Sequence, residues 1–101
     1  MRFARLATYD LIKGTFAELV GLAETGILPV LARESGFVDY GLVDIGQNKI
    51  VSISIWETRE RAESAVNVAQ MWDHENMADR IHLVSDVVGD LALLHGAPIA
   101  A

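Results

Sequence analysis

The sequence contains no cysteine and only two prolines, and its eight Lys and Arg residues are outnumbered by fourteen Asp and Glu. Without cysteine, disulfide frameworks, thiolate metal sites and cysteine nucleophiles are all excluded. The formal net charge of −6 opposes binding to nucleic acid or to an anionic membrane, because both need clustered Lys and Arg. We therefore expect neither nucleic acid nor a membrane among its partners.

Signals for a membrane span, for secretion and for common cofactors are missing too. No stretch approaches the roughly 18 uninterrupted apolar residues of a membrane span. The N-terminal segment MRFARLATYD carries arginines and an acidic residue where a signal peptide would have a continuous apolar core. The glycine-rich loops of dinucleotide and nucleoside phosphate sites and the GxSxG turn of triad hydrolases are also absent. We expect a cytoplasmic protein that uses no cofactor.

Apolar residues are abundant and make up 51% of the 101 residues. A chain of this length suffices for one domain with one core, so we assign residues 1–101 to a single domain. Small folds have much surface to cover with polar atoms, and this apolar fraction is high for so short a chain. We therefore expect part of the apolar surface to be buried against a second chain.

The most regular pattern is the alternation from Val51 to Trp56, which predicts a β-strand. One side of the strand is aliphatic and the other carries serines and a tryptophan, so we expect both sides to be covered. Thr58 then offers an N-cap oxygen to a helix beginning near Arg59. The two sides consist of Val51, Ile53 and Ile55 on the first and Ser52, Ser54 and Trp56 on the second.

The remaining chain predicts three further strands and one further helix. Apolar residues at three-and-four spacing predict a long helix over 13–34, with a kink or break near 25–28 where Gly26 and Pro29 interrupt it. A short turn at 46–48 predicts an antiparallel hairpin. The other predicted elements are strands over 2–10, 37–45 and 84–94, and a helix over 59–72 with a polar continuation to about 82.

This order, β-α-β-β-α-β, predicts a ferredoxin-like α+β fold. Its simplest arrangement is a four-stranded antiparallel sheet with both helices on one face. The other face is then left uncovered although its strands carry apolar residues. We expect that face to pack on the same face of an identical chain, which would make the protein a homodimer.

The chain resembles the dimeric α/β barrel superfamily, and within it the antibiotic biosynthesis monooxygenase-like group. The resemblance spans nearly the whole chain and rests on element order and two local features. One is the Gly36-Phe37 entry to the second strand after a Pro-containing helix end, and the other is the segment Ile55 to Thr58 followed by Arg59 and Glu60. The superfamily includes cofactor-free oxygenases, haem-degrading enzymes, decarboxylases and isomerases, so its fold does not choose a reaction.

The resemblance also implies roles for particular residues. In the cofactor-free quinone-forming oxygenases of this group, a tryptophan on the third strand works with an asparagine four residues earlier. Trp56 matches that tryptophan, whereas Ser52 offers a hydroxyl where the carboxamide would be. The haem-degrading branch uses an asparagine on the first strand, where this chain has Thr8, and a tryptophan and a histidine on the second helix. Trp72 and His74 are too close in sequence to reproduce that pair.

Each candidate residue has a structural alternative. Trp56 either lines a substrate cavity between sheet and helices, together with Ser52 and Ser54, or packs in the core. His74 is either a general base tuned by neighbouring carboxylates or part of a solvated helix face. Tyr9, Tyr40 and Trp72 are the further candidates for lining the pocket, and packing is the alternative for both tyrosines. We expect no metal site, because the histidines lack ligand spacing.

Two functions from different classes are consistent with these residues. The first is a cofactor-independent monooxygenase-like protein acting on a small aromatic or polyketide-type substrate, with Trp56, Ser52 and His74 as catalytic candidates. The second is a non-catalytic dimeric module that binds a small apolar or aromatic molecule. A substrate-sized cavity with a polar group inside it would favour the first, and a packed, dry core would favour the second.

Overall fold

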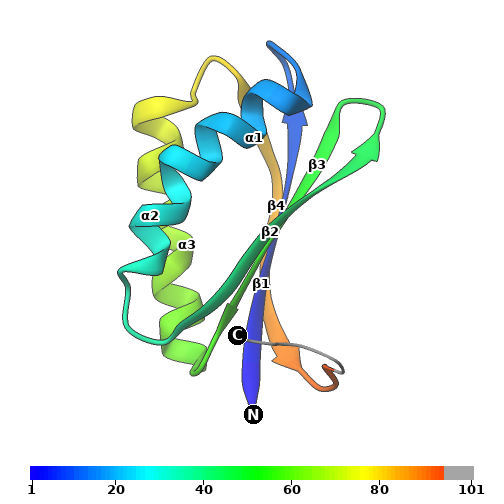
Figure 1. Cartoon of the computed structure of the whole chain (residues 1–101). Helices are drawn as coiled ribbons and strands as arrows, with labels where there is room; N and C mark the ends of the chain where they lie inside the picture. Colours follow the sequence, from blue (N-terminus) through cyan, green and yellow to red (C-terminus); the bar gives the residue numbers. More distant parts are fainter. Residues whose placement is uncertain (95–101) are drawn as a thin grey trace.

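The computed structural model describes residues 1–94 and shows one antiparallel sheet with a layer of helices on one face (Figure 1). The strand order is β2-β3-β1-β4, and every neighbouring pair is antiparallel. This confirms the predicted ferredoxin-like α+β fold. The elements are β1 (Arg2–Leu11), α1 (Phe16–Thr25), α2 (Ile27–Ala32), β2 (Phe37–Gly46), β3 (Lys49–Trp56), α3 (Arg59–Asn76) and β4 (Ile81–Leu91).

The helices begin and break where the local chemistry requires. The Thr15 side chain accepts a hydrogen bond from the Glu18 amide, and the Glu18 carboxylate accepts one from the Thr15 amide, which completes a capping box on α1. Thr58 caps α3 by accepting from the Arg61 amide at 3.2 Å. The predicted break is confirmed, because α1 ends at Thr25 and α2 starts after Gly26.

The β2–β3 hairpin turns through two residues with positive φ. Gln47 has φ 55° and Asn48 has φ 59°, as a type I′ turn requires at both central positions. Lys49 and Gly46 pair across the base of this turn. The predicted antiparallel hairpin is therefore confirmed.

The end of α3 and the start of β4 differ from the sequence prediction. The polar continuation to about residue 82 is wrong, since α3 ends at Asn76 and β4 runs over Ile81–Leu91 instead of 84–94. Met77 is buried and closes the helix, and the Ile12 amide then donates to the Arg80 carbonyl at 2.7 Å. A register shift opposite Thr8 and Tyr9 also breaks the alternation in β4, which concealed the start of this strand.

The two sides of β3 have different surroundings. Ile50, Ser52, Ser54 and Trp56 are buried under the helices, and the intervening aliphatic side chains are half-buried on the open side. The predicted alternation is confirmed, but within the described chain only one side of the sheet is covered (Figure 1). Apolar residues on or beside the open face are Leu6, Val43, Ile45 and Val87, with 38%, 43%, 54% and 56% exposure.

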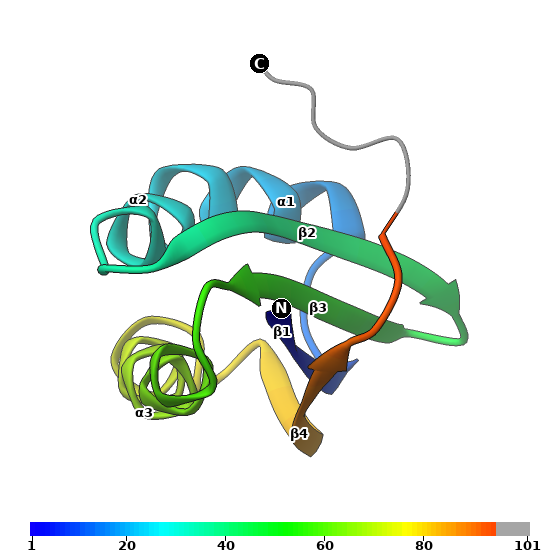
Figure 2. The same ribbon diagram turned by 90° about the horizontal axis from the view of Figure 1, so that it is seen from below.

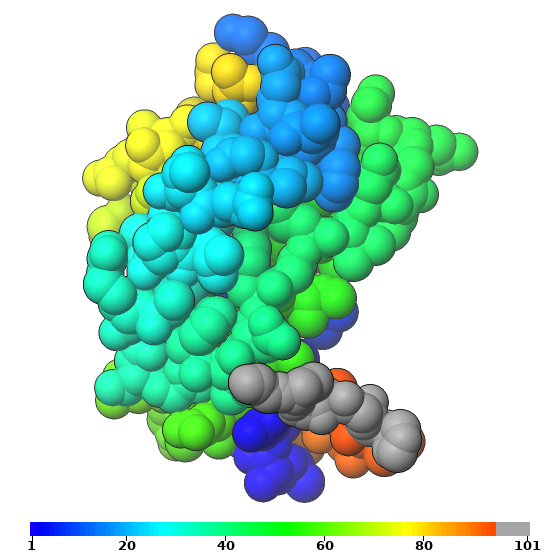
Figure 3. Space-filling model, viewed as in Figure 1, coloured from blue at the N-terminus to red at the C-terminus, as the bar shows by residue number. Residues whose placement is uncertain are grey.

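The helices cover different parts of the same sheet face. Viewed from the end, α1 and α2 lie on the β2 side and α3 lies towards β4 (Figure 2). The side away from the helices is hollowed beneath the projecting β2–β3 hairpin (Figure 3). No helix among residues 1–94 is long and apolar enough to cross a membrane.

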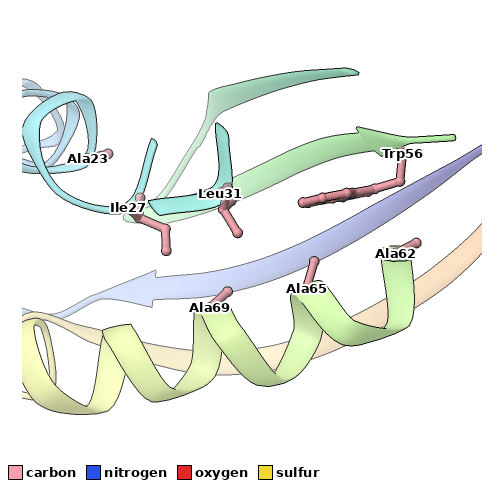
Figure 4. Close-up of a cluster of buried hydrophobic side chains, with 7 residues drawn as sticks. All are labelled: Ala23, Ile27, Leu31, Trp56, Ala62, Ala65 and Ala69. Carbon is pink, nitrogen blue, oxygen red and sulfur yellow. The ribbon is translucent and has the colours of Figure 1, made fainter. Parts of the chain in front are cut away.

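One end of the layer between sheet and helices is a closely packed apolar cluster (Figure 4). Trp56 is fully buried there, and its ring meets that of Phe37 edge-on at a centroid distance of 5.5 Å. Small side chains on α3 let the helix approach the sheet closely. The buried members are Ala23, Ile27, Leu31, Trp56, Ala62, Ala65 and Ala69.

Candidate functional site

Beside this cluster, towards the other end of the layer, lies a small cavity with polar groups in its wall. Ala23, Ile27, Leu31 and Ala69 of the cluster also line it. Its volume is about 30 Å3, which exceeds the roughly 10–15 Å3 that a cavity needs to hold one water molecule. Four elements contribute ionisable or hydroxyl groups to it. The contributing residues are Arg5 and Tyr9 from β1, Tyr40 from β2, Ser52 from β3 and Asp73 from α3.

A chain of hydrogen bonds crosses this end of the molecule. Arg5 donates from Nε to Oδ1 of Asp86 at 2.9 Å and from Nη2 to Oδ2 of the same carboxylate. The Tyr9 hydroxyl donates to Oδ2 of Asp73 at 2.8 Å and lies 3.5 Å from Nη2 of Arg5. Gln70 donates to Asp86 at 3.1 Å. The network therefore links two carboxylates through one guanidinium and one phenol.

Strand and helix periodicity place these groups together. Arg5 and Tyr9 are four residues apart on β1, so both side chains project to the helix side of the sheet. Asp86 lies opposite Ala7 on β4, between them. Asp73 comes from α3, which passes over β1 and β4. The sequence thus brings four polar side chains from three elements into one interior region.

Burial changes the proton affinities of these groups. Burial raises the pKa of the Asp73 carboxyl above its ordinary value, and the hydrogen bond from Tyr9 offsets only part of that rise. Burial, with the Asp73 charge added, also raises the pKa of Tyr9, and it raises that of Tyr40 to about 12. Burial lowers the pKa of Arg5, but its hydrogen bond with Asp86 and nearby charges outweigh this effect. Asp73 is therefore the carboxylate here that burial makes more basic.

A wider depression lies directly outside the cavity. Its volume is about 390 Å3, and it is open to solvent between α3 and β4. Tyr9, Asp73 and Ile81 belong to the walls of both spaces. The remaining residues of the depression are Gln70, His74, Ala78, His82 and Leu83. The Tyr9–Asp73 pair thus stands at the boundary between an interior cavity and a surface site.

In the structure, the candidate residues predicted from the sequence fall into three groups. Tyr9, Tyr40, Ser52 and Trp72 line the interior cavity. His74 is exposed and lies in the outer depression. Trp56 and Ser54 lie outside both walls and bond to each other, with the indole N–H donating to the Ser54 hydroxyl at 2.8 Å.

Three residues of the network were missed by the sequence interpretation, namely Arg5, Asp73 and Asp86. A signal for Arg5 was present, because it shares the inward register of Ala7 and Tyr9 in the first strand. A charged residue in an otherwise apolar register needs a buried partner. Asp73 and Asp86 carried no such signal, since the end of α3 and the register of β4 were both misplaced.

Metal binding has no support in the described part of the chain. Among residues 1–94, no group of three or more His, Asp or Glu side chains is arranged to hold a metal ion.

Comparisons with known proteins show which solved structures share this fold. No family model matches the sequence, and no curated protein matches it. The solved structure of SnoaB from Streptomyces nogalater, a cofactor-independent oxygenase, superposes with a TM-score of 0.71 at 15% identity, covering 95% of this chain and 98% of that one. The chain has the fold of the antibiotic biosynthesis monooxygenase-like group. At this identity the likeness concerns the fold alone.

Two further structures agree with this fold. A candidate antibiotic biosynthesis monooxygenase from Chloroflexus aurantiacus matches with a TM-score of 0.64 at 14% identity, covering 95% of this chain and 98% of that one. NE2512 from Nitrosomonas europaea, a protein of unknown function, matches with a TM-score of 0.70 at 17% identity, covering 99% and 96%. The chain thus shares its architecture with an oxygenase and with a protein of no stated activity.

Proposed function

We propose that the protein is a cofactor-independent monooxygenase-like enzyme for a small aromatic or polyketide-type substrate. The observation that carries this proposal is the buried network of Arg5, Tyr9, Asp73 and Asp86 beside a cavity. The fold, which a cofactor-independent oxygenase shares, also supports it. Buried ionisable groups grouped around a cavity are typical of functional sites.

The proposed reaction uses the substrate itself as the reductant. A bound phenolate or enolate, formed by loss of one proton, reacts with dioxygen at an activated ring carbon that carries one hydrogen. One oxygen atom becomes the new carbonyl oxygen, and the other leaves as water with that hydrogen and the proton removed earlier. The protein contributes by holding the substrate, excluding water and stabilising the anion.

In this proposal each reactant occupies a different part of the site. The interior cavity of about 30 Å3 is far smaller than the roughly 150 Å3 cavity that takes up benzene. It accommodates water or dioxygen, whereas the ring fits the outer depression of about 390 Å3. Ser52, Tyr40 and Trp72 then border the space for the small reactant, and His74 borders the ring.

Oxygen uptake with a panel of quinols and phenols tests this function. We expect the wild-type protein to consume oxygen with at least one quinol. Ser52→Ala, which removes a hydroxyl from the cavity wall, should lower kcat by about tenfold, as loss of one hydrogen bond of about 1.4 kcal/mol would. Ser64→Ala on the exposed surface of α3 is the matched control and should leave uptake unchanged. Absence of uptake throughout the panel would contradict the proposal.

The second function is a non-catalytic module that binds a small apolar or aromatic molecule. The small interior volume and the packing of Trp56 in the core favour it, because neither provides a substrate-sized interior. Calorimetric binding of the same quinols without oxygen uptake would support this function over the enzyme.

We also propose that the open sheet face packs on a second copy of the chain. Its exposed apolar residues would lose contact with water in such a dimer. Ile53 is half-buried on this side of β3, one of the two inner strands. Ile53→Lys should weaken the dimer by about 3 kcal/mol or more, because each copy would bury an unpaired charge. Leu22→Lys on α1 is the matched control, and light scattering gives the molar mass. A wild-type monomer at micromolar concentration would contradict this proposal.

A further inference from the structure

The two carboxylates of the interior network have different electrostatic environments. Asp86 is neutralised by Arg5, which meets it at two points. Among residues 1–94, none of the ion pairs involves Asp73. The network therefore contains one satisfied ion pair and one carboxylate whose charge has no cation bound to it.

Asp73 also has an acceptor atom to spare. Its Oδ2 accepts the hydrogen bond from the Tyr9 hydroxyl at 2.8 Å. No hydrogen bond within residues 1–94 reaches its Oδ1. A carboxylate oxygen has room for further donors, so a hydroxyl presented from the depression can bond to this atom.

The depression provides a surface for an aromatic ring beside that carboxylate. Ile81, Leu83 and Ala78 supply apolar contacts. The ionisable groups that face Asp73 come from every element packed around it: Arg5 and Tyr9 on β1, Tyr40 on β2, His74 on α3, and His82 and Asp86 on β4. Arg5 is the permanent cation among these, and Asp86 already neutralises it.

We propose that Asp73 is the proton acceptor of this site, and that its substrate is a neutral, acidic phenol or enol bound in the outer depression. This inference rests on the proposed oxygenase function and adds the residue that activates the substrate. The substrate O–H bond breaks, the proton moves to the free oxygen of Asp73, and the electron pair stays on the substrate oxygen. The hydroxyl of Tyr9 is then free to donate to the resulting phenolate or enolate.

The local charge selects the substrate class. With Asp73 ionised, Asp86 paired and Arg5 the one fixed cation, the site carries one net negative charge. A carboxylate or phosphate substrate would add a second negative charge at short range, which is unfavourable in a partly buried site. Proton transfer from a neutral substrate only relocates the existing charge. Enols of 1,3-dicarbonyl compounds and phenols with electron-withdrawing substituents suit this site better than simple phenols, whose pKa near 10 lies too far above that of a carboxyl.

A nitrophenol tests proton transfer separately from turnover, because its phenolate absorbs visible light and its neutral form does not. At a slightly acidic pH, binding to wild-type protein should increase the phenolate absorption. Asp73→Asn keeps the shape of the side chain and its ability to accept from Tyr9. In wild-type protein the proton stays within the site, so the phenolate fraction of the bound probe should change little with pH. In Asp73→Asn the proton is lost to solvent, so this fraction should rise about tenfold per pH unit below the pKa of the probe. Asp73→Glu, which restores a carboxylate, should recover part of the wild-type behaviour.

The control and a second measurement separate the possible failures. Asp79→Asn removes an exposed carboxylate nearby and should leave the absorption unchanged. In wild-type protein, infrared spectroscopy should show a protonated carboxyl band appearing as the probe binds, which requires no folded variant. Bound probe whose ionisation depends on pH in the same way with Asn at position 73, or the absence of that band, would overturn the role of Asp73. Oxygen uptake would then still decide the proposed function independently.

Discussion

The two ends of the layer between sheet and helices use the same strands for opposite purposes. At one end Trp56 pairs in register with Phe3 and Phe37, and the alanines of α3 fill the space above it. At the other end Tyr9 lies opposite Ile50, and a cavity with charged groups in its wall replaces close packing. The comparison shows apolar packing at the tryptophan end and a cavity bordered by ionisable groups at the tyrosine end.

The largest expected effect is at the apolar end. Trp56→Ala should lower the free energy of unfolding by about 3–5 kcal/mol, because a fully buried ring and its contact with Phe37 are lost. Urea denaturation followed by circular dichroism measures the change. A loss below about 1 kcal/mol would contradict the assignment of Trp56 to the core.

The next effect concerns the buried ion pair at the polar end. Arg5→Met should cost about 3 kcal/mol, since it leaves Asp86 charged and without its main partner. The double variant Arg5→Met with Asp86→Leu should regain most of that loss, because two apolar groups need no partners. The same denaturation measurement applies. Equal stabilities of the single and double variants would contradict the expected recovery.

Two glycines on the helix side of the layer test how closely α1 and α2 pack against the Trp72 ring. A Cβ at Gly26 would overlap the Trp72 ring, which lines the cavity, so Gly26→Ala should destabilise by about 1–3 kcal/mol. A Cβ at Gly21 in α1 would meet no atom within 4 Å. Gly21→Ala should therefore stabilise the protein by about 0.5–1 kcal/mol. Thermal unfolding of both variants measures the two changes, and shifts of the same sign would contradict this packing.

The smallest effect is a pH dependence at the polar end. The pKa of Asp73 is raised in the folded protein above its usual 3.8, so the folded state holds this proton more tightly. Its contribution to stability is full below the unfolded value and falls as pH rises through the folded value. Asp73→Asn removes this decline, and its stability relative to wild type should increase from acidic to neutral pH. Denaturation across that range measures it, and a relative decrease would contradict the raised pKa.

The sequence alone predicted most of the fold and part of the site. The order of elements, the break at Gly26, the cap at Thr58 and the alternation of β3 all follow from local chemistry. Alternation also predicted that Ser52 shares one side of β3 with Ser54 and Trp56. Whether Tyr9 lies on that same side of the sheet depends on strand register, which alternation leaves open. The start of β4 was misplaced because a register shift beside Tyr9 interrupts the alternation.

What the sequence determined by itself was periodicity: which residues share a side of a strand or a face of a helix, and where caps and glycines end each element. Only the tertiary structure decided which of those sides meet. The ion pair between Arg5 and Asp86 joins residues 81 positions apart, and the bond between Tyr9 and Asp73 joins residues 64 apart. Such contacts depend on strand register and on the line of α3 over the sheet. Neither leaves a pattern in a single sequence, because both are set by packing across the whole layer.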